Sequence, residues 1–598
     1  MPTSDTDRTA IYQANFIEVK HEIDISTTSG GSFVWELIHP SLLLMKIISN
    51  SNFLQQIFGE VANTHPCTRD KPWGLVVGFD ECTPGNKQKT DNRKKNMNVN
   101  FSFIELGCHL ASEDFWFTPI SVRSTLISTA QGGWSRMLKD YLVLQLLSDQ
   151  GLYTAGVPLM LNGELFLLFA NLKILLSDGD GLRMALQWKG ASGLKPCARH
   201  FNVYKKGSDL AHRLPGYCEI TCTRHEELKC WNVDQFKVAI GVVLEARARF
   251  HRGELVAARL KDVEKSYGYA FTADGLCADL HLQELFDIQR VIRKDWAHTL
   301  LQHGTLTVEA WLLIKACETE GVCRQEDLRR FMVLFCRPKH RRNLQWGIWN
   351  IFSDFSMEKN RERDALKTSQ SELLTIYGVL RVFFQIHTHG VASVEPNAKS
   401  YTLCCSVVDL ILLAKKGVIT PAVAAGRLKV RVGEFLEQHI AVYGVEFIIP
   451  KHHWMWDIVE QLEDDDFVHD MFSLERLHLR ARRSADEIDN TICYERSVLS
   501  GVLNHHLRHS LETDRPFGLS HKVAPFPRVA GAFVADSLSI HGFQCSINDY
   551  VWCGTNPGLV VACCAEAQHL MVVVDVLTEK LEEVTCVRCH PSFWHKNN

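Results

Sequence analysis

The sequence predicts an α/β protein: a mixed-sheet core interrupted by a large helical insertion, with a small β-rich C-terminal domain. Three observations predict this fold class. Short apolar runs with strand periodicity lie between residues 73 and 122, long stretches with helical spacing fill residues 236–445, and short β-branched runs follow residue 516. At 598 residues the chain is too long for one hydrophobic core, so several domains are expected.

The composition is that of an ordinary globular protein, with 46% hydrophobic and 22% charged residues. A formal net charge of -4 argues against a uniformly basic coat for nucleic acid, although local basic patches can still attract phosphate. The 20 cysteines are expected to be mostly small buried hydrophobic residues. We find no secretory signal, and the apolar stretches are too short or too interrupted to cross a membrane, so a soluble intracellular protein is expected.

The core elements follow one another in an order that defines a fold. The first element is an apolar run that ends in an acid, at 73–80. An alternating run at 98–106 and a third strand candidate at 115–122 follow it. A helical segment at 134–147 and a second apolar run at 165–176 complete the series. The last run is equally compatible with a helix by composition. If this last run is a strand, the elements follow the order of the RNase H-like fold, in which one acid ends the first strand and a second acid follows the fourth.

The remaining segments are divided by changes in periodicity. The predicted domains are a helical lead-in, the first part of the core, a Cys/His insert, a helical insertion, a closing helical part and a β-rich domain, at 1–70, 71–186, 187–235, 236–445, 446–515 and 516–598. Helices are expected over 236–249, 280–291, 308–319, 373–386 and 453–512, and a loop over 360–371. Late strands are expected at 551–553, 559–562 and 571–576.

Two acids end the apolar runs of the predicted core. Asp80 and Asp178 would be brought together if their strands are adjacent and parallel. Converging carboxylates hold the two Mg²⁺ ions of phosphoryl-transfer sites, about 4 Å apart. Glu81 and Asp180 are neighbouring acids that can take the same place. The alternative interpretation is that each acid is only a solvated turn residue.

A second cluster has the spacing of metal ligands. Cys197 and His200 form one Cys-x-x-His pair, and Cys222 and His225 form another about 20 residues later. These four residues match the nitrogen and sulfur ligands of tetrahedral structural Zn²⁺. Independent buried thiols and surface histidines are the alternative interpretation.

Three basic runs are candidates for contacts with a phosphate backbone, at residues 93–95, 337–342 and 476–483. Glu475 directly precedes the last run, which would place an acid beside a basic helix. Each run alone is also compatible with a solvated surface.

Several blocks of sequence resemble transposases. The blocks Phe79–Asn86, Asn92–Lys94 and Phe101–Glu105 resemble transposase-like proteins abundant in dinoflagellate genomes. The segment Asp178–Cys197 resembles the region after the second catalytic acid of Plavaka and CACTA-type transposases, where a Pro-Cys-x-x-Cys knuckle follows. Three further segments resemble later blocks of the same group: Asp295–His298, Pro450–His453 and Phe472–Arg476. The resemblance covers roughly residues 70–500.

The resemblance implies a DDE-type DNA transposase or a domesticated descendant, which cuts and joins DNA with Mg²⁺. It implies an RNase H-like core interrupted by a helical insertion before a third acid. Carried onto this chain, Asp80 and Asp178 are the first two acids and Glu475 is the third, with Asp295 as the alternative. A DNA partner, a nuclear location and a homodimer are implied in the same way.

This chain departs from the family pattern at one position, because His200 stands where the second knuckle cysteine is expected. Zinc accepts histidine there. A different class of function therefore stays open: a catalytically inactive, zinc-stabilised scaffold that binds nucleic acid or protein. An unrelated helical interaction protein is expected instead if residues 73–178 form no sheet.

Overall fold

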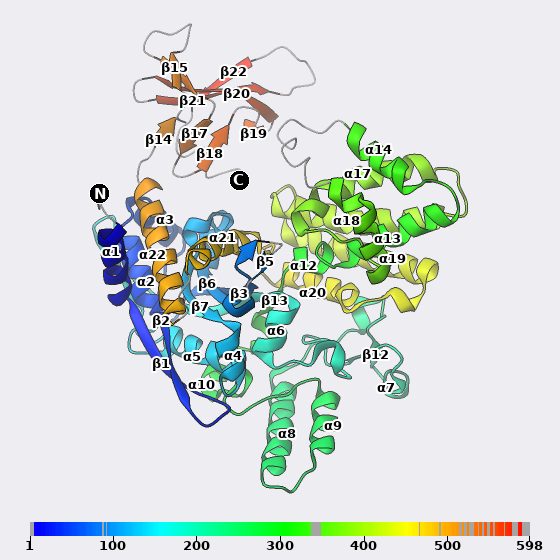
Figure 1. Ribbon diagram of the computed structural model, residues 1–598, viewed down its shortest axis with the longest axis horizontal. Helices are drawn as coiled ribbons and strands as arrows, with labels where there is room; N and C mark the ends of the chain where they lie inside the picture. Colours follow the sequence, from blue (N-terminus) through cyan, green and yellow to red (C-terminus); the bar gives the residue numbers. More distant parts are fainter. Residues whose placement is uncertain are drawn as a thin grey trace.

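The computed structural model describes residues 5–86, 89–90, 92–335, 349–465, 467–488 and 492–513, and the strands between residues 517 and 588. It shows a mixed α/β protein in which a body built on a five-stranded sheet lies beside a body of helices (Figure 1). The predicted α/β class with a mixed sheet is therefore confirmed.

The central sheet has the strand order β13-β10-β3-β6-β7. Strand β3 pairs antiparallel with β6, and β6 pairs antiparallel with β7, whereas β10 runs parallel to both β3 and β13. The bounds are Trp73–Cys82 for β3, Asn96–Phe103 for β6, Phe117–Arg123 for β7, Ala170–Ser177 for β10 and Ile292–Lys294 for β13. The strands predicted at 73–80, 98–106 and 115–122 are thus present, and the ambiguous run 165–176 is extended.

Burial on both faces explains why β3 lies in the middle of the sheet. Every residue from Trp73 to Phe79 is buried, as is typical of a strand covered on two sides. Helix α5 (Gly133–Leu147) covers the sheet with Trp134, whose ring centroid lies 5.6 Å from that of Phe79. Helix α6 (Gly179–Leu186) begins directly after β10. A hairpin of β8 (Val157–Leu161) and β9 (Glu164–Leu168) precedes β10.

The first 70 residues are not wholly helical, which corrects the prediction for this segment. Strands β1 (Lys20–Ser26) and β2 (Ser32–Ile38) form an antiparallel hairpin. The first run alternates polar and apolar residues over Glu22–Ser26, the second is mostly apolar, and Gly30 takes a φ of 88° in the turn between them, a conformation that favours glycine. The flanking helices are α1 (Asp5–Ile17), α2 (Pro40–Ser49) and α3 (Asn52–Thr64).

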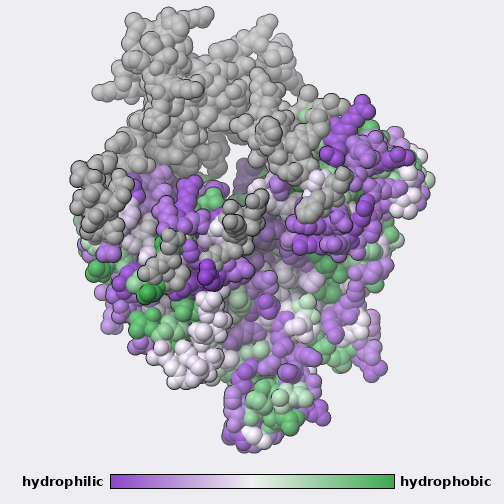
Figure 2. Space-filling view, in the orientation of Figure 1, coloured by the Kyte–Doolittle hydropathy of each residue, from purple (hydrophilic) through white to green (hydrophobic). Residues whose placement is uncertain are grey.

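The segment between β10 and β13 packs largely on the sheet body. It contains short elements, β11 (Val203–Tyr204), α7 (Asp209–Arg213) and β12 (Cys218–Glu219), followed by the hairpin of α8 (Val233–His251) and α9 (Ala257–Tyr267). This hairpin projects from the body, and apolar residues are visible on it in Figure 2. Its exposed apolar side chains include Val238, Val242 and Val256. Residues 280–291 form two short helices, α10 (Leu280–Leu285) and α11 (Ile288–Val291), rather than one.

A second hydrophobic core, made of helices, begins at Trp296 and ends at Val468. Its helices are α12 (Trp296–Leu300), α13 (Thr305–Thr319), α14 (Gln325–Leu334), α16 (Asp354–Arg363), α17 (Gln370–Thr388), α18 (Glu395–Lys415), α19 (Pro421–Tyr443) and α20 (Pro450–Asp465). The helices predicted at 308–319 and 373–386 are present. The loop predicted at 360–371 is only partly correct, because α16 extends to Arg363 before the chain turns.

The chain then returns to the sheet body through α21 (Phe472–Asp486) and α22 (Tyr494–Thr513). Leu474 and Leu477 of α21 and Leu499 and Leu503 of α22 belong to the same core as the sheet. The helical body is therefore an insertion between β13 and α21. The long helical segment predicted over 453–512 is three helices in the described part of the chain.

The C-terminal region contains antiparallel strands, in line with the predicted β-rich composition. These are β14 (Phe517–Leu519), β15 (Val523–Pro525), β16 (Ala532–Ala535), β17 (Ser537–Ile540), β18 (Phe543–Ser546), β19 (Tyr550–Cys553), β20 (Asn556–Glu566), β21 (His569–Val576) and β22 (Val584–Arg588). They form one sheet of order β14-β17-β18 and another built on β15-β16-β20-β21-β22. The strands predicted at 551–553, 559–562 and 571–576 lie within β19, β20 and β21.

Within the described residues, one helix has the length and apolar composition needed to cross a membrane. It is α18, and half of its most apolar window is buried inside the structure.

The contact between α21 and β3 leads to a prediction about stability. A Cβ added to Gly78 would lie 2.3 Å from Cδ1 of Leu474, so Gly78→Ala should destabilise the protein by about 1–3 kcal/mol through overpacking. Leu474→Ala should cost about 2–5 kcal/mol by leaving a cavity. Leu474→Ala makes room for the added Cβ of Gly78→Ala, which in turn fills part of the cavity. The double variant should therefore be less destabilised than the sum, as measured by thermal unfolding.

The matched control is Gly241→Ala on α8, where an added Cβ meets nothing within 4 Å. This variant should be neutral or slightly stabilised, because alanine has the higher helix propensity. Strict additivity of the Gly78 and Leu474 variants would show that α21 does not rest on β3 at this point.

Candidate functional site

Three acids lie at the same level of three neighbouring parallel strands. Gly78 pairs with Leu176, and Ser177 pairs with Lys294. Asp80 lies within β3, which continues to Cys82, whereas Asp178 and Asp295 directly follow β10 and β13. Ser177 Oγ also donates a hydrogen bond of 2.6 Å to the carbonyl oxygen of Phe79, which ties the ends of β10 and β3 together. Neighbouring strands lie about 4.8 Å apart, so the backbones that carry the acids are close.

Asp80 lies in a strongly acidic environment. Its side chain is 16% exposed, and its Oδ1 accepts a hydrogen bond of 2.7 Å from the Glu81 backbone N–H. Burial, followed by the negative charges of Asp178 and Glu475, raises the pKa of Asp80 to about 7 against the lowering effect of His298. The three predicted catalytic acids therefore interact electrostatically, although they are far apart in sequence.

Asp178 is placed by the start of α6. Its Oδ1 accepts a hydrogen bond of 2.6 Å from the N–H of Gly181 and so caps the helix. The two neighbouring acids proposed as alternatives are engaged elsewhere. Glu81 accepts a hydrogen bond from Ser124 and pairs with Lys95 at 2.5 Å, whereas Asp180 is exposed and lies 3.3 Å from Arg183.

Glu475 reaches the same region from the first turn of α21. Its side chain is 34% exposed, and Oε1 lies 3.8 Å from Nε2 of His298. Burial raises the pKa of Glu475, the positive charge of His298 opposes this rise, and Asp295 adds to it. The helix axis is fixed by the packing of Leu474 against Gly78, so Glu475 is held close to the end of β3.

Asp295, the alternative third acid, is engaged in a different way. It is 1% exposed, and it accepts hydrogen bonds from the backbone N–H groups of Ala297, His298 and Met471. Its Oδ2 also lies 2.5 Å from Nδ1 of His298. Because these partners occupy both carboxylate oxygens, Asp295 serves chiefly to join β13, α12 and α21.

Two cations face the acids. Burial lowers the pKa of His298, but the hydrogen bond and charge of Asp295 and the charges of Asp80 and Glu475 outweigh it and raise the pKa to about 9. His298 is therefore protonated at neutral pH. Burial lowers the pKa of Lys451 to about 8, although the charge of Asp178 counteracts this change. Lys451 Nζ donates to the carbonyl oxygens of His298 and Gln302, at 2.7 Å each.

The donor set at the strand ends fits Mg²⁺, which prefers carboxylate oxygens and retains several waters. The mutual repulsion that raises the pKa of Asp80 is the repulsion that a divalent cation relieves. The acids are not drawn tightly together. In the described part of the chain, neither group of donor atoms that lie within 4.8 Å of one another includes Asp80, Asp178 or Glu475.

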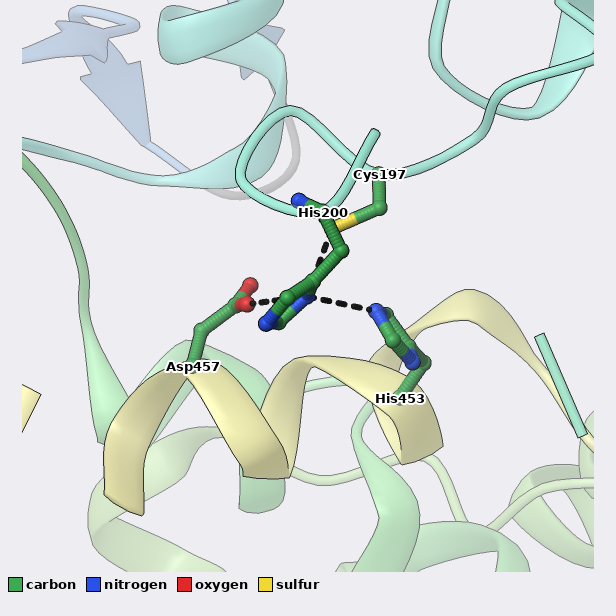
Figure 3. A group of neighbouring side chains, drawn as sticks. All are labelled: Cys197, His200, His453 and Asp457. Carbon is green, nitrogen blue, oxygen red and sulfur yellow. Dashed lines mark hydrogen bonds and ion pairs between the residues drawn. The ribbon is translucent and has the colours of Figure 1, made fainter. Parts of the chain in front are cut away.

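One of those tight groups contains half of the predicted zinc ligands (Figure 3). Cys197 and His200 meet His453 and Asp457 of α20, and all four side chains are buried. His200 Nδ1 lies 3.3 Å from Cys197 Sγ, 3.1 Å from His453 Nε2 and 3.4 Å from Asp457 Oδ1.

The other two predicted zinc ligands lie outside this group. Cys222 Sγ is directed to the carbonyl oxygen of Arg224 and to Glu227, at 3.3 and 3.4 Å. His225 Nε2 lies 3.1 Å from Oε1 of Glu460, a carboxylate that also contacts His200. The sequence analysis missed His453 and Asp457, although their spacing of four residues places both on one helix face and was a usable signal.

The basic runs are largely paired within the protein. Arg476 and Arg480 of α21 contact Glu113 at 3.1 and 3.0 Å, and Lys95 contacts Glu81. Arg483 of the same helix is exposed. The run 337–342 lies outside the described residues.

Comparison with known proteins provides no family assignment. No protein-family model matches the chain. A search of curated proteins likewise finds no match.

The acidic site leads to a prediction about pH. Because the pKa of folded Asp80 is raised from 3.8 to about 7, the folded state loses stability as pH rises through this window, and the full cost of roughly 4 kcal/mol is present above pH 7. Asp80→Asn removes the charge. It should therefore raise the Tm at pH 8 without divalent cations and have a smaller effect at pH 5.

Mg²⁺ should raise the Tm of the wild-type protein at pH 8 and leave that of Asp80→Asn nearly unchanged. Asp24→Asn, a substitution of an exposed acid on β1, serves as the control and should alter neither result. A lower Tm for Asp80→Asn at pH 8 would show that Asp80 is not held in a repulsive environment.

Proposed function

We propose that this protein is a DNA transposase-like enzyme, or a domesticated descendant of one, that cleaves and joins DNA strands with divalent metal. One observation carries the proposal: Asp80, within β3, and Asp178, directly after β10, lie at the same level of adjacent parallel strands, and Glu475 returns to them after a long helical insertion. These are the three acids that the sequence resemblance implies.

The topology supports an RNase H-like assignment of the sheet. Three consecutive antiparallel strands, β3, β6 and β7, are joined on the β3 side by two parallel strands, β10 and β13. The first acid lies near the end of the first strand, and the second acid directly follows the fourth, close to the arrangement expected for that fold. The helical body enters after the fifth strand and ends before the helix that carries Glu475.

The chain's residues suit phosphoryl transfer. Asp80, Asp178 and Glu475 would hold two Mg²⁺ ions, which supply activation of the attacking oxygen and neutralisation of the leaving oxygen. His298, protonated at neutral pH, would hold Glu475 and Asp80 in place by charge. Water, and then a freed 3′-hydroxyl, would attack phosphorus in line, so no covalent bond to the protein is required.

The proposed substrate also implies a partner, a location and an assembly. DNA is the proposed partner, and a nuclear location and a homodimer go with it by the same resemblance. Arg483 is an exposed cation on the helix that begins beside Glu475, where a DNA backbone would pass. A catalytically inactive scaffold that binds nucleic acid or protein is the alternative, and the experiment below separates the two.

The test is Mg²⁺- or Mn²⁺-dependent nicking of supercoiled plasmid by the full-length protein. Asp80→Asn, Asp178→Asn and Glu475→Gln should each lower the nicking rate by at least about 10²-fold, the scale expected for loss of one electrostatic stabiliser in an active site. Asp180→Asn is the matched control, because this neighbour of Asp178 is exposed and pairs with Arg183, so its loss should leave nicking unchanged.

Equal activity of Asp178→Asn and Asp180→Asn would contradict the assigned site. Absence of metal-dependent nicking by the wild-type protein, together with retained DNA binding, would favour the inactive scaffold.

A further inference from the structure

We propose that Cys197, His200, His453 and Asp457 bind one structural Zn²⁺ ion that fastens the Cys/His insert to helix α20. This set differs from the two Cys-x-x-His pairs that the sequence suggests, because it takes two ligands from one loop and two from a helix more than 250 residues later. The site does not depend on the proposed nuclease activity.

Three of the distances between donor atoms are close to the edges of a zinc tetrahedron. Bonds of roughly 2.0–2.3 Å from zinc to oxygen, nitrogen and sulfur give tetrahedral edges of roughly 3.3–3.7 Å. The three distances from His200 Nδ1 to the sulfur, nitrogen and oxygen of its partners are 3.3, 3.1 and 3.4 Å. One cysteine, two histidines and one aspartate are a ligand set that zinc accepts.

Hydrogen bonding without a cation leaves this group unsatisfied. Three partners converge on the single nitrogen Nδ1 of His200, which carries at most one proton or one lone pair in the ring plane. Asp457 Oδ1 and His453 Nδ1 are buried and have no hydrogen-bond partner among the described residues. Such groups are costly in a protein interior, and a cation bound to Asp457 Oδ1 removes part of that cost.

The surrounding residues orient the ligands as an outer shell does in zinc proteins. Nε2 of His200, the nitrogen away from the site, lies 2.9 Å from Oε1 of Glu460, so the carboxylate fixes the ring and its tautomer. Glu460 is held in turn by Arg199 and His225. The other oxygen of Asp457 contacts the Lys294 ammonium.

A second group, formed by His200, Cys230 and Glu460, is the weaker candidate. Cys230 is exposed, and Glu460 already pairs with Arg199. Only three donors are present there, whereas structural zinc sites take four.

The proposed zinc site is connected to the acidic site through neighbouring residues. Lys294 is the last residue of β13 and precedes Asp295, so the site is connected to the strand end through Asp457 and Lys294. Trp454 follows His453 and packs so closely on Gly179 that an added Cβ there would lie 2.4 Å from the ring. Zinc would therefore fix α20 against both β13 and the start of α6.

The first experiment is metal analysis of the purified full-length protein by mass spectrometry. One zinc ion per chain is expected. Cys197→Ser and His453→Ala should each lower zinc content at least tenfold, whereas Glu460→Gln should retain zinc but weaken its affinity about 10–100-fold. Cys222→Ser is the matched control and should keep its zinc, because this thiol is directed toward Arg224 and Glu227.

The second measurement uses the protein loaded with Co²⁺ and guards against variants that fail to fold. The wild-type spectrum should show tetrahedral d–d bands and one thiolate charge-transfer band. His453→Cys should keep the metal and strengthen that charge-transfer band, since a second thiolate joins the site.

Absence of zinc from the wild-type protein, or equal zinc loss in Cys222→Ser and His453→Ala, would overturn this site. The result is distinguishable from failure of the nuclease proposal. Asp80→Asn should carry a full complement of zinc whether or not the protein cleaves DNA, because Asp80 belongs to neither group of tightly gathered donors.

Discussion

The buried carboxylate of Asp295 fixes the sheet body relative to the helical body. The chain leaves the sheet body at this residue, builds a separate helical core, and returns at Met471, whose N–H donates to Asp295 Oδ1 at 3.3 Å. Trp296 and Phe472, on either side of the junction, pack with ring centroids 6.0 Å apart. Hydrogen bonds to a charged group contribute roughly 1.5–3 kcal/mol each, so this junction orders α21 and with it Glu475.

The electrostatics of the acidic site follow from this junction. Asp295 raises the pKa of His298, and the protonated ring then faces Glu475 and Asp80. Without that cation, more of the repulsion between Asp80, Asp178 and Glu475 would be uncompensated in a partly buried region. Asp295 therefore acts on the other acids through His298, although its own oxygens are occupied.

The sequence predicted what depends on local pattern. Strand periodicity with an acid near each predicted strand end singled out Asp80 and Asp178, and the structure brings both to one level of adjacent parallel strands, although β3 continues past Asp80 to Cys82. The hairpin before residue 40 was missed, although its alternating first run and its glycine turn are local signals. The spacing of four residues between His453 and Asp457 was a local signal for that pair alone. Their meeting with Cys197 could not be predicted, because it depends on how a helical body of some 170 residues folds back.

Helix α20 explains why two chemically different sites lie close together. Its first turn places Lys451 against the carbonyl oxygens of His298 in α12 and of Gln302, near the charges of Asp178 and Asp295. His453 in the same turn and Asp457 one turn later face the Cys/His insert, while Trp454 packs on Gly179. A helix that carries these contacts cannot shift without disturbing both sites. The buried group of Cys197, His200, His453 and Asp457 therefore fixes the helical insertion relative to the strand ends, whatever reaction takes place there.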